Sequence, residues 1–144
     1  MIDPRTAPYA AMLLRIALGS LFILHLYWKF EILGFEHWWI SLHNAGYPAA
    51  LMIYVLLAES AGALLLIPGI LPRWVSLFAV PAIFGAAHFW LARKGLFFTA
   101  AGAELPLLWG LALVVQALLG NGAYAVKVPH LPGWQWRRRQ PVTS

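Results

Sequence analysis

Apolar residues occur along this chain in long blocks that are separated by short stretches rich in glycine, proline and polar residues. Four blocks stand out, at residues 10–28, 49–67, 74–92 and 103–119. Each approaches the roughly 20 apolar residues that a helix needs to cross the hydrocarbon core of a bilayer. The blocks lack the amphipathic rhythm of helices that face water on one side. The pattern therefore predicts an all-α fold, a membrane four-helix bundle with four transmembrane helices.

Glycine and proline mark the ends of these blocks. Pro68 and Gly69 end the second block, Pro72 precedes the third, and Gly120 follows the fourth. Lipid offers no hydrogen-bond partners to the backbone, so each block must satisfy its own backbone groups as a helix. We expect one membrane domain over residues 1–144, with residues 120–144 forming a cytoplasmic tail.

Composition agrees with a lipid environment. The chain has 144 residues, of which 62% are hydrophobic and 10% are charged. Soluble domains carry about 25% charged residues, so this chain lacks the polar groups to cover a water-facing surface. The net charge of +5 comes partly from a terminal cluster, Arg137 to Arg139, which fits anionic lipid headgroups and excludes nucleic acid as the expected partner. Without cysteine, disulfides and dithiol redox chemistry are excluded.

The distribution of basic residues predicts the orientation. Four spans place both termini and the turn at Arg73 on one side of the membrane. That side carries six basic residues, namely Arg5, Arg73, Lys127, Arg137, Arg138 and Arg139. The other side carries three, namely Lys29, Arg93 and Lys94. The positive-inside rule then predicts cytoplasmic termini in a bacterial-type inner membrane, and the aromatic loop 29–48 is expected to lie along the outer headgroup region.

Two charged residues are expected inside the first two spans at similar depth. Arg15 lies near the cytoplasmic end of the first span, and Glu59 lies in the antiparallel second span. A charge in a membrane helix costs roughly 2.5–3.5 kcal/mol on insertion scales and needs a partner. We therefore predict an ion pair between Arg15 and Glu59. It either fixes helix register or closes one end of a polar cavity, and a protonated, unpaired Glu59 is the remaining alternative.

A second polar group is expected toward the outer surface. His25, Lys29, His88 and Glu104 come from three spans and lie at similar depth. They form either a hydrogen-bonded structural cluster or a pocket for a small headgroup such as a quinone carbonyl. Two histidines and a glutamate are suitable metal ligands, but the spacing carries no metal signature and Lys29 opposes a cation, so no metal is predicted. Haem is disfavoured because bulky side chains leave it little room.

The order of these polar positions resembles the DoxX family of small four-span membrane proteins, from about residue 14 to residue 127. The resemblance is carried by residues 14–19 (LRIALG), His25 with Lys29, residues 58–62 (AESAG), residues 67–73 (IPGILPR), Phe97 with Phe98, and residues 102–106 (GAELP). It implies that Arg15, Lys29, Glu59 and Glu104 are the positions of interest. Members of this family resemble or accompany subunits of quinone-linked membrane oxidoreductases, including thiosulfate:quinone types.

The expected function is therefore that of a membrane subunit or anchor in a quinone-linked redox system. A quinone-like headgroup would bind near His25, Lys29, His88 and Glu104, and the histidines would exchange protons with it. The chain shows no cofactor motif of its own, so electrons would come from a redox enzyme partner, and whether the chain is itself an enzyme stays open. The alternatives are a non-enzymatic assembly or scaffold protein and a small-solute or proton pathway. The expected protein partner is either the redox enzyme or further copies of this chain in a homo-oligomer.

Overall fold

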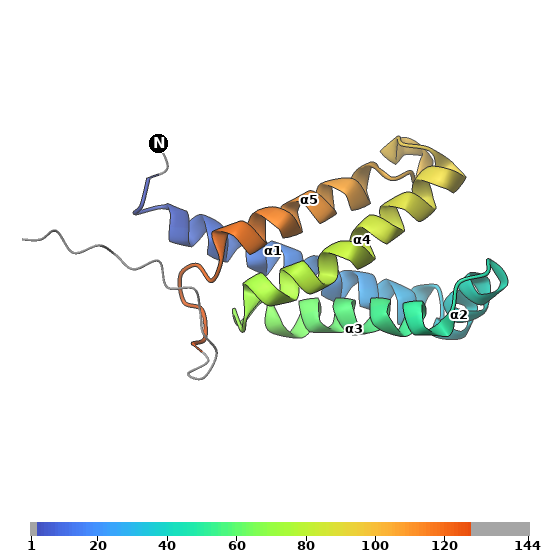
Figure 1. The fold of residues 1–144 in the computed structure, drawn as a ribbon, viewed down its shortest axis with the longest axis horizontal. Coiled ribbons are helices and arrows are strands. Elements are labelled where there is room, and N and C mark those ends of the chain that lie inside the picture. The colour runs from blue at the N-terminus through green and yellow to red at the C-terminus, as the bar shows by residue number, and fades with distance from the viewer. Residues whose placement is uncertain (1–2, 128–144) are drawn as a thin grey trace, which may run out of the picture.

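The computed structural model describes residues 3–127, and over these residues all regular secondary structure is helical (Figure 1). The helices are α1 (Ala7–Tyr27), the π-helical turn η1 (Trp28–Ile32), α2 (Phe35–Asn44), α3 (Ala49–Leu65), α4 (Pro72–Lys94), the 3-10 turn η2 (Phe98–Ala100) and α5 (Glu104–Leu119). The predicted all-α fold is confirmed. The arginine cluster at 137–139 and most of the predicted tail lie outside the described residues.

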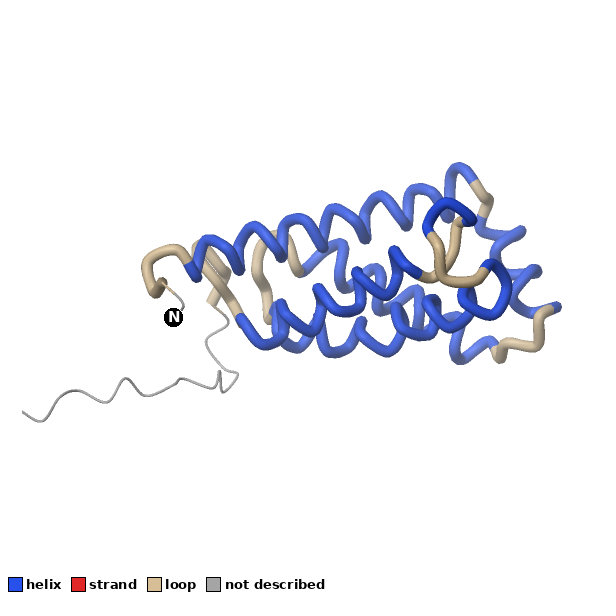
Figure 2. Tube along the Cα trace, turned by 90° about the horizontal axis from the view of Figure 1, so that it is seen from above, coloured by secondary structure: helices blue, strands red, loops and turns tan. Residues whose placement is uncertain are grey.

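The four long helices lie side by side along the long axis of the molecule (Figure 1). α1 packs against α3, α3 against α4, and α4 most extensively against α5, while α5 also contacts α1 and closes the ring. The start of α1 and the end of α5 lie at one end of this bundle, called here the strap end. The short α2 lies at the opposite end, called the α2 end (Figure 1). Figure 2 shows the connecting loops gathered at these two ends.

Two of the helical segments are long and apolar enough to cross a membrane: Ala7–Ile32 with 26 residues and Pro72–Lys94 with 23 residues. The other two apolar helices are shorter, with 17 residues in α3 and 16 in α5. At 1.5 Å per residue, these two helices are each roughly 25 Å long.

Small residues bring the helices into close contact. The ring of Phe22 on α1 occupies the space beside Gly62 on α3, and Gly19 lies against Ile67 in the same interface. Around this contact, the apolar core combines residues from all four long helices, among them Leu18, Ala58, Ala79 and Leu113. The core thus depends on glycine where a large side chain of the neighbouring helix needs room.

The first helix continues beyond the predicted boundary at residue 28. Leu33 N donates to Trp28 O at 2.8 Å, an i to i+5 bond that makes residues 28–32 a π-helical turn. Gly34 follows with φ +88°, a left-handed conformation that favours glycine and turns the chain into α2. The aromatic loop predicted here therefore contains a ten-residue helix.

The segment that follows α5, residues 120–127, is called the strap because it crosses the strap end of the bundle. Ala123 N donates to Pro8 O at 2.8 Å, and Val126 N donates to Pro68 O at 3.1 Å. The strap thereby joins the start of α1 to the turn between α3 and α4. It belongs to the folded bundle, whereas the sequence placed it in a tail.

The distribution of polar and apolar side chains is the reverse of that in a soluble protein. Leu64 and Leu118 on the outer surface are 72% and 75% exposed, whereas Arg15, Lys29 and Glu59 are at most 3% exposed. In water, large apolar surfaces of this kind would associate, and ionisable side chains would seek the solvent. The described bundle therefore presents the outer surface of a membrane protein that contacts lipid.

Candidate functional site

A buried ion pair joins the end of the first helical segment to the middle of α3. Lys29 Nζ lies 2.5 Å from Glu59 Oε2, and both side chains are almost fully enclosed. Lys29 Nζ also lies 4.2 Å from the centre of the Trp38 ring, where the negative face of the indole attracts the ammonium. The pair balances two charges that would each be costly in lipid.

His25 connects this pair to the surface of the bundle. It precedes Lys29 by four residues and so lies on the same face of the helix. His25 Nε2 is 3.6 Å from Glu59 Oε1, and the His25 side chain remains 38% exposed. Lys29, Glu59 and His25 are called the polar cluster below.

Two indole rings flank the imidazole of the polar cluster. Trp28 stacks on His25 with ring centres 5.7 Å apart and planes at 26°. Trp109 from α5 meets His25 edge-on, also at 5.7 Å, and packs in turn on Phe22. The indole Nε1 of Trp109 is buried without a hydrogen-bond partner among residues 3–127. His25 is thus held in an aromatic frame that leaves part of its ring accessible.

The predicted ion pair between Arg15 and Glu59 is wrong. Arg15 Nη1 donates to Asn121 O at 2.6 Å and Arg15 Nη2 donates to Ala123 O at 2.8 Å, so Arg15 binds the strap. The reason lies in side-chain direction, because Cα–Cβ bonds lean toward the N-terminus of their own helix. In antiparallel α1 and α3, Arg15 therefore leans toward the strap end and Glu59 toward the α2 end.

The same geometry explains why Glu59 meets Lys29. Lys29 lies nearer the α2 end than Glu59 does. The side chain of Lys29 leans back toward the strap end, whereas the side chain of Glu59 leans toward the α2 end. The two side chains converge in the α1–α3 interface. The π-helical turn holds Lys29 in this position at the end of the helix.

The outer group predicted from four residues comes together only in part. His25 and Lys29 meet, as the four-residue spacing predicts, but their partner is Glu59. His88 is exposed on α4, and no hydrogen bond or ion pair joins it to the polar cluster within the described chain. Glu104 is exposed at the start of α5, where its Oε2 accepts a hydrogen bond from Phe98 N at 2.9 Å. Depth alone did not specify which way these side chains face.

The aromatic members of the site were not singled out from the sequence. Trp38 falls within the aromatic loop 29–48 expected along the headgroup region, and Trp109 falls within the apolar block 103–119. Nothing in the spacing links Trp38 to Lys29, because the turn at Gly34 reverses the chain between them. Only the accumulation of aromatic residues after Lys29 hinted at a special role for that segment.

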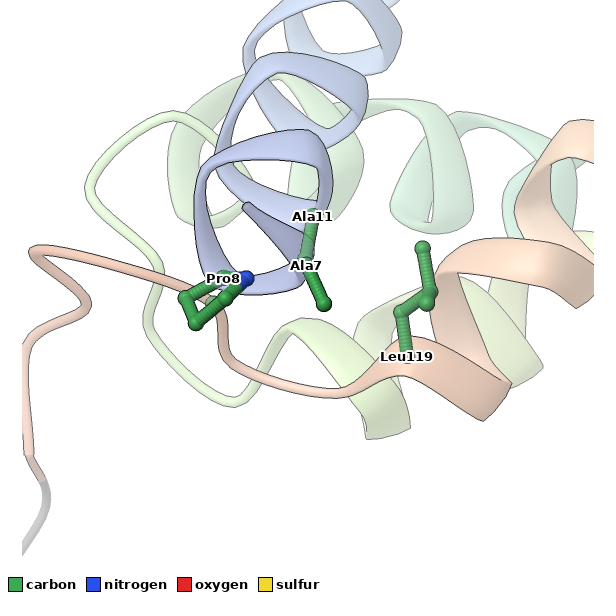
Figure 3. Close-up of a pocket in the computed structure, with 5 residues that line it drawn as sticks. Ala7, Pro8, Ala11 and Leu119 are labelled. Carbon is green, nitrogen blue, oxygen red and sulfur yellow. The ribbon is translucent and has the colours of Figure 1, made fainter. Parts of the chain in front are cut away.

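His25, His88 and Glu104 line neither of two hollows on the surface of the described bundle. One, of about 250 Å³, is lined by Phe35, Glu36 and Trp39 on α2. The other, of about 280 Å³, lies at the strap end, where Ala7, Pro8 and Ala11 of α1 face Leu119 of α5 (Figure 3). Within residues 3–127, no group of three His, Cys, Asp or Glu side chains is arranged to hold a metal ion.

Comparison with known proteins identifies the family. The DoxX family model matches residues 10–93, more than half of the chain. This range contains all three residues of the polar cluster and Arg15, but not Glu104. No curated protein and no solved structure is similar enough to count as a match. By the family match, and with apolar helices of membrane-spanning length, the chain belongs to the DoxX family of membrane proteins.

Proposed function

We propose that this chain is a membrane subunit or anchor of a quinone-linked oxidoreductase system, and that the polar cluster contacts the quinone headgroup. The family points to membrane proteins associated with oxidoreductase systems. The observation that carries the proposal is the position of His25, which is partly exposed between two indoles and 3.6 Å from a buried carboxylate.

The proposal includes four membrane crossings with both termini on the cytoplasmic side of a bacterial-type inner membrane. α3 and α5, at roughly 25 Å, are somewhat shorter than a hydrocarbon core of about 30 Å, a mismatch that local thinning of the bilayer accommodates. Both helices run alongside the longer α1 and α4 and expose large apolar side chains such as Leu64 and Leu118. The excess of basic residues on the side of the termini supports the orientation.

The residues around His25 suit a flat headgroup that carries carbonyl oxygens. The indole of Trp28 offers a planar aromatic surface, and the imidazole offers a hydrogen-bond donor or acceptor. The buried N–H of Trp109, whose ring meets His25 edge-on, is a further donor without a partner among the described residues. The residues present therefore fit a quinone better than a metal or a haem.

The contribution of this chain would be binding and proton exchange. A quinone takes up two electrons and two protons when it is reduced, and a redox enzyme partner would supply the electrons. His25 is the group suited to exchange protons, because imidazole titrates near neutral pH. Glu59 Oε1 lies 3.6 Å from His25 Nε2, and Lys29 balances the charge of Glu59.

The test compares variants of two histidines, His25 and His88, in the purified protein reconstituted in lipid nanodiscs. Binding of a quinone analogue is followed by quenching of tryptophan fluorescence. His25→Ala is expected to weaken binding about tenfold, which corresponds to the loss of one hydrogen bond in an apolar site. His88→Ala is the matched control and is expected to bind normally, because His88 is exposed and takes no part in the hydrogen bonds and ion pairs of the cluster. Absence of binding by the wild type, or equal losses in both variants, would reject the proposal.

Docking of a redox partner is a second candidate, favoured by exposed aromatic residues at the α2 end. Phe97 and Phe98 are 71% and 62% exposed in the loop between α4 and α5. In this scaffold role, the polar cluster would serve only helix packing. Changing both residues to serine would then abolish co-purification of the partner enzyme while quinone-analogue binding stays unchanged. Retention of the partner would count against docking at this loop.

A further inference from the structure

The side chain of Lys29 is covered by α2, a helix that has few other contacts with the bundle. Its side chain is only 2% exposed although it lies at the end of the α1 segment, next to a turn. The carboxylate of Glu59 covers one side of the ammonium, and the ring of Trp38 covers another at 4.2 Å. Trp38 belongs to α2, so the burial of Lys29 depends on where α2 lies.

α2 is connected at both ends through glycines in left-handed conformations. Gly34 has φ +88° and Gly46 has φ +87°, and nothing lies close to either position. Such residues absorb large changes in backbone angles at low cost. Both connections therefore have the character of hinges.

Few contacts hold α2 against the bundle. Trp38 is its one buried residue, and its neighbours are η1 and α3. Within residues 3–127, no side-chain hydrogen bond links α2 to another helix. Phe35 stacks on Phe30 of η1, with ring centres 5.3 Å apart, on the outer side of the molecule. The contact between Trp38 and Lys29 is thus the main attachment of α2 to the interior.

The backbone beneath Lys29 is itself unusual. Residues 28–32 form a π-helical turn, which is rare and is found frequently at functional sites. A return of this turn to α-helical pairing would rotate the residues that follow it, and with them the start of α2, relative to Lys29, because each residue of an α-helix is offset by a fixed angle. The hinge at Gly34 follows this turn directly.

We propose that α2 is a lid over the buried Lys29–Glu59 pair, and that displacement of Trp38 admits water to Lys29 from the α2 end. This gives the pair a second entry, separate from the exposed edge of His25. The existence of the lid does not depend on quinone binding. Its use as an entry for protons rests on the proposed function.

The lid is tested by the reactivity of lysine amines in the full-length protein in lipid nanodiscs. The chain contains three lysines, Lys29, Lys94 and Lys127, and the last two are exposed. A water-soluble amine-acylating reagent is applied, and modification at each lysine is measured over time by mass spectrometry. In the wild type, Lys29 is expected to react far more slowly than the two internal references.

The decisive comparison is between neighbouring tryptophans. Trp38→Ala is expected to raise the acylation rate of Lys29 about tenfold, in line with the loss of a cation–π contact in a desolvated site. Trp39→Ala is the matched control and is expected to leave the rate unchanged, because Trp39 has no contact with the ammonium. Circular dichroism checks that each variant keeps its helices.

If Trp38→Ala does not fold, Trp38→Leu decides the question, because leucine keeps part of the apolar volume without the aromatic face. It is expected to raise the Lys29 rate by a smaller factor. An unchanged Lys29 rate in the folded Trp38 variant, an equal rise in Trp39→Ala, or a wild-type Lys29 as reactive as Lys94 would each overturn the lid. Failure of quinone binding in the fluorescence assay leaves this result unaffected, so the two proposals fail separately.

Discussion

Lys29 and Glu59, 30 positions apart in the chain, bring an ammonium and a carboxylate within 2.5 Å across the α1–α3 interface. Both side chains are enclosed by protein, and the surface around the helices is apolar. An ion pair in such surroundings is costly to break, because the remaining charge has no water to solvate it. The pair therefore couples the stability of the bundle to the integrity of the polar cluster.

Removing one partner of the pair should destabilise the protein strongly. Lys29→Met and Glu59→Leu are each expected to lower the free energy of unfolding by about 3–5 kcal/mol, because each leaves an unpaired buried charge. The double variant is expected to recover most of this loss, since an apolar pair of similar volume is often neutral in a buried site. Unfolding in mixed detergent micelles, followed by circular dichroism, measures the three free energies. A double variant as unstable as the sum of the single variants would argue against a direct pair.

Replacing Arg15 should loosen the attachment of the strap and leave the polar cluster unaffected. Arg15→Met removes hydrogen bonds to the carbonyls of Asn121 and Ala123, and bonds from a charged donor contribute about 1.5–3 kcal/mol each. Hydrogen exchange at the amides of Ala123 and Val126 is expected to accelerate. Arg5→Met, which changes an exposed arginine near the same end, is the control and should leave both amides protected.

A double-mutant cycle distinguishes the observed pairing from the one that depth alone suggests. Arg15→Met and Glu59→Leu should have additive effects on the free energy of unfolding, within about 0.5 kcal/mol, because they share no partner. The cycle between Lys29 and Glu59 should instead show a large coupling energy. Coupling between Arg15 and Glu59 comparable to that between Lys29 and Glu59 would contradict the structure.

Glu104 is expected to support a local turn and to have no part in ligand binding. Its carboxylate accepts the amide hydrogen of Phe98, so Glu104→Ala should cost about 1 kcal/mol of unfolding free energy. Glu104→Gln keeps an acceptor oxygen and should cost less. Both variants should bind a quinone analogue with the wild-type affinity in the fluorescence assay. A loss of affinity for the quinone analogue in either variant would indicate that Glu104 belongs to the binding site.

The helices follow from the sequence because their cause is local. Long apolar blocks bounded by glycine and proline predicted all four bundle helices, and the spacing of His25 and Lys29 placed both on one face. The pattern of apolar residues does not indicate a π-helical turn, so it does not predict that the first helical segment continues to residue 32. The sequence alone predicts a tail where the strap lies, because the hydrogen bonds of the strap join it to residues more than 50 positions away.

The partners within the site depend on directions that residue positions do not specify. Estimates of depth set Arg15 level with Glu59, but the opposite lean of side chains on antiparallel helices separates them. Depth also grouped His88 with His25, although His88 faces outward from α4. Such contacts depend on the rotation of each helix about its own axis. These helices carry apolar residues on every side, so the sequence does not indicate which face of a helix is buried.

The contact between Gly62 and Phe22 provides a further prediction about the same interface. A side chain at Gly62 would overlap the Phe22 ring, so Gly62→Ala is expected to cost about 1–3 kcal/mol of unfolding free energy through overpacking. Gly85→Ala is the matched control, because nothing lies near Gly85 and alanine favours the helix by up to about 1 kcal/mol. Phe22→Leu should partly rescue Gly62→Ala by making room. The free energies of unfolding are measured in micelles. Equal effects of the two glycine variants would show that the α1–α3 interface tolerates wider spacing. The close contact at Gly62 would then not explain the helix register that joins Lys29 to Glu59.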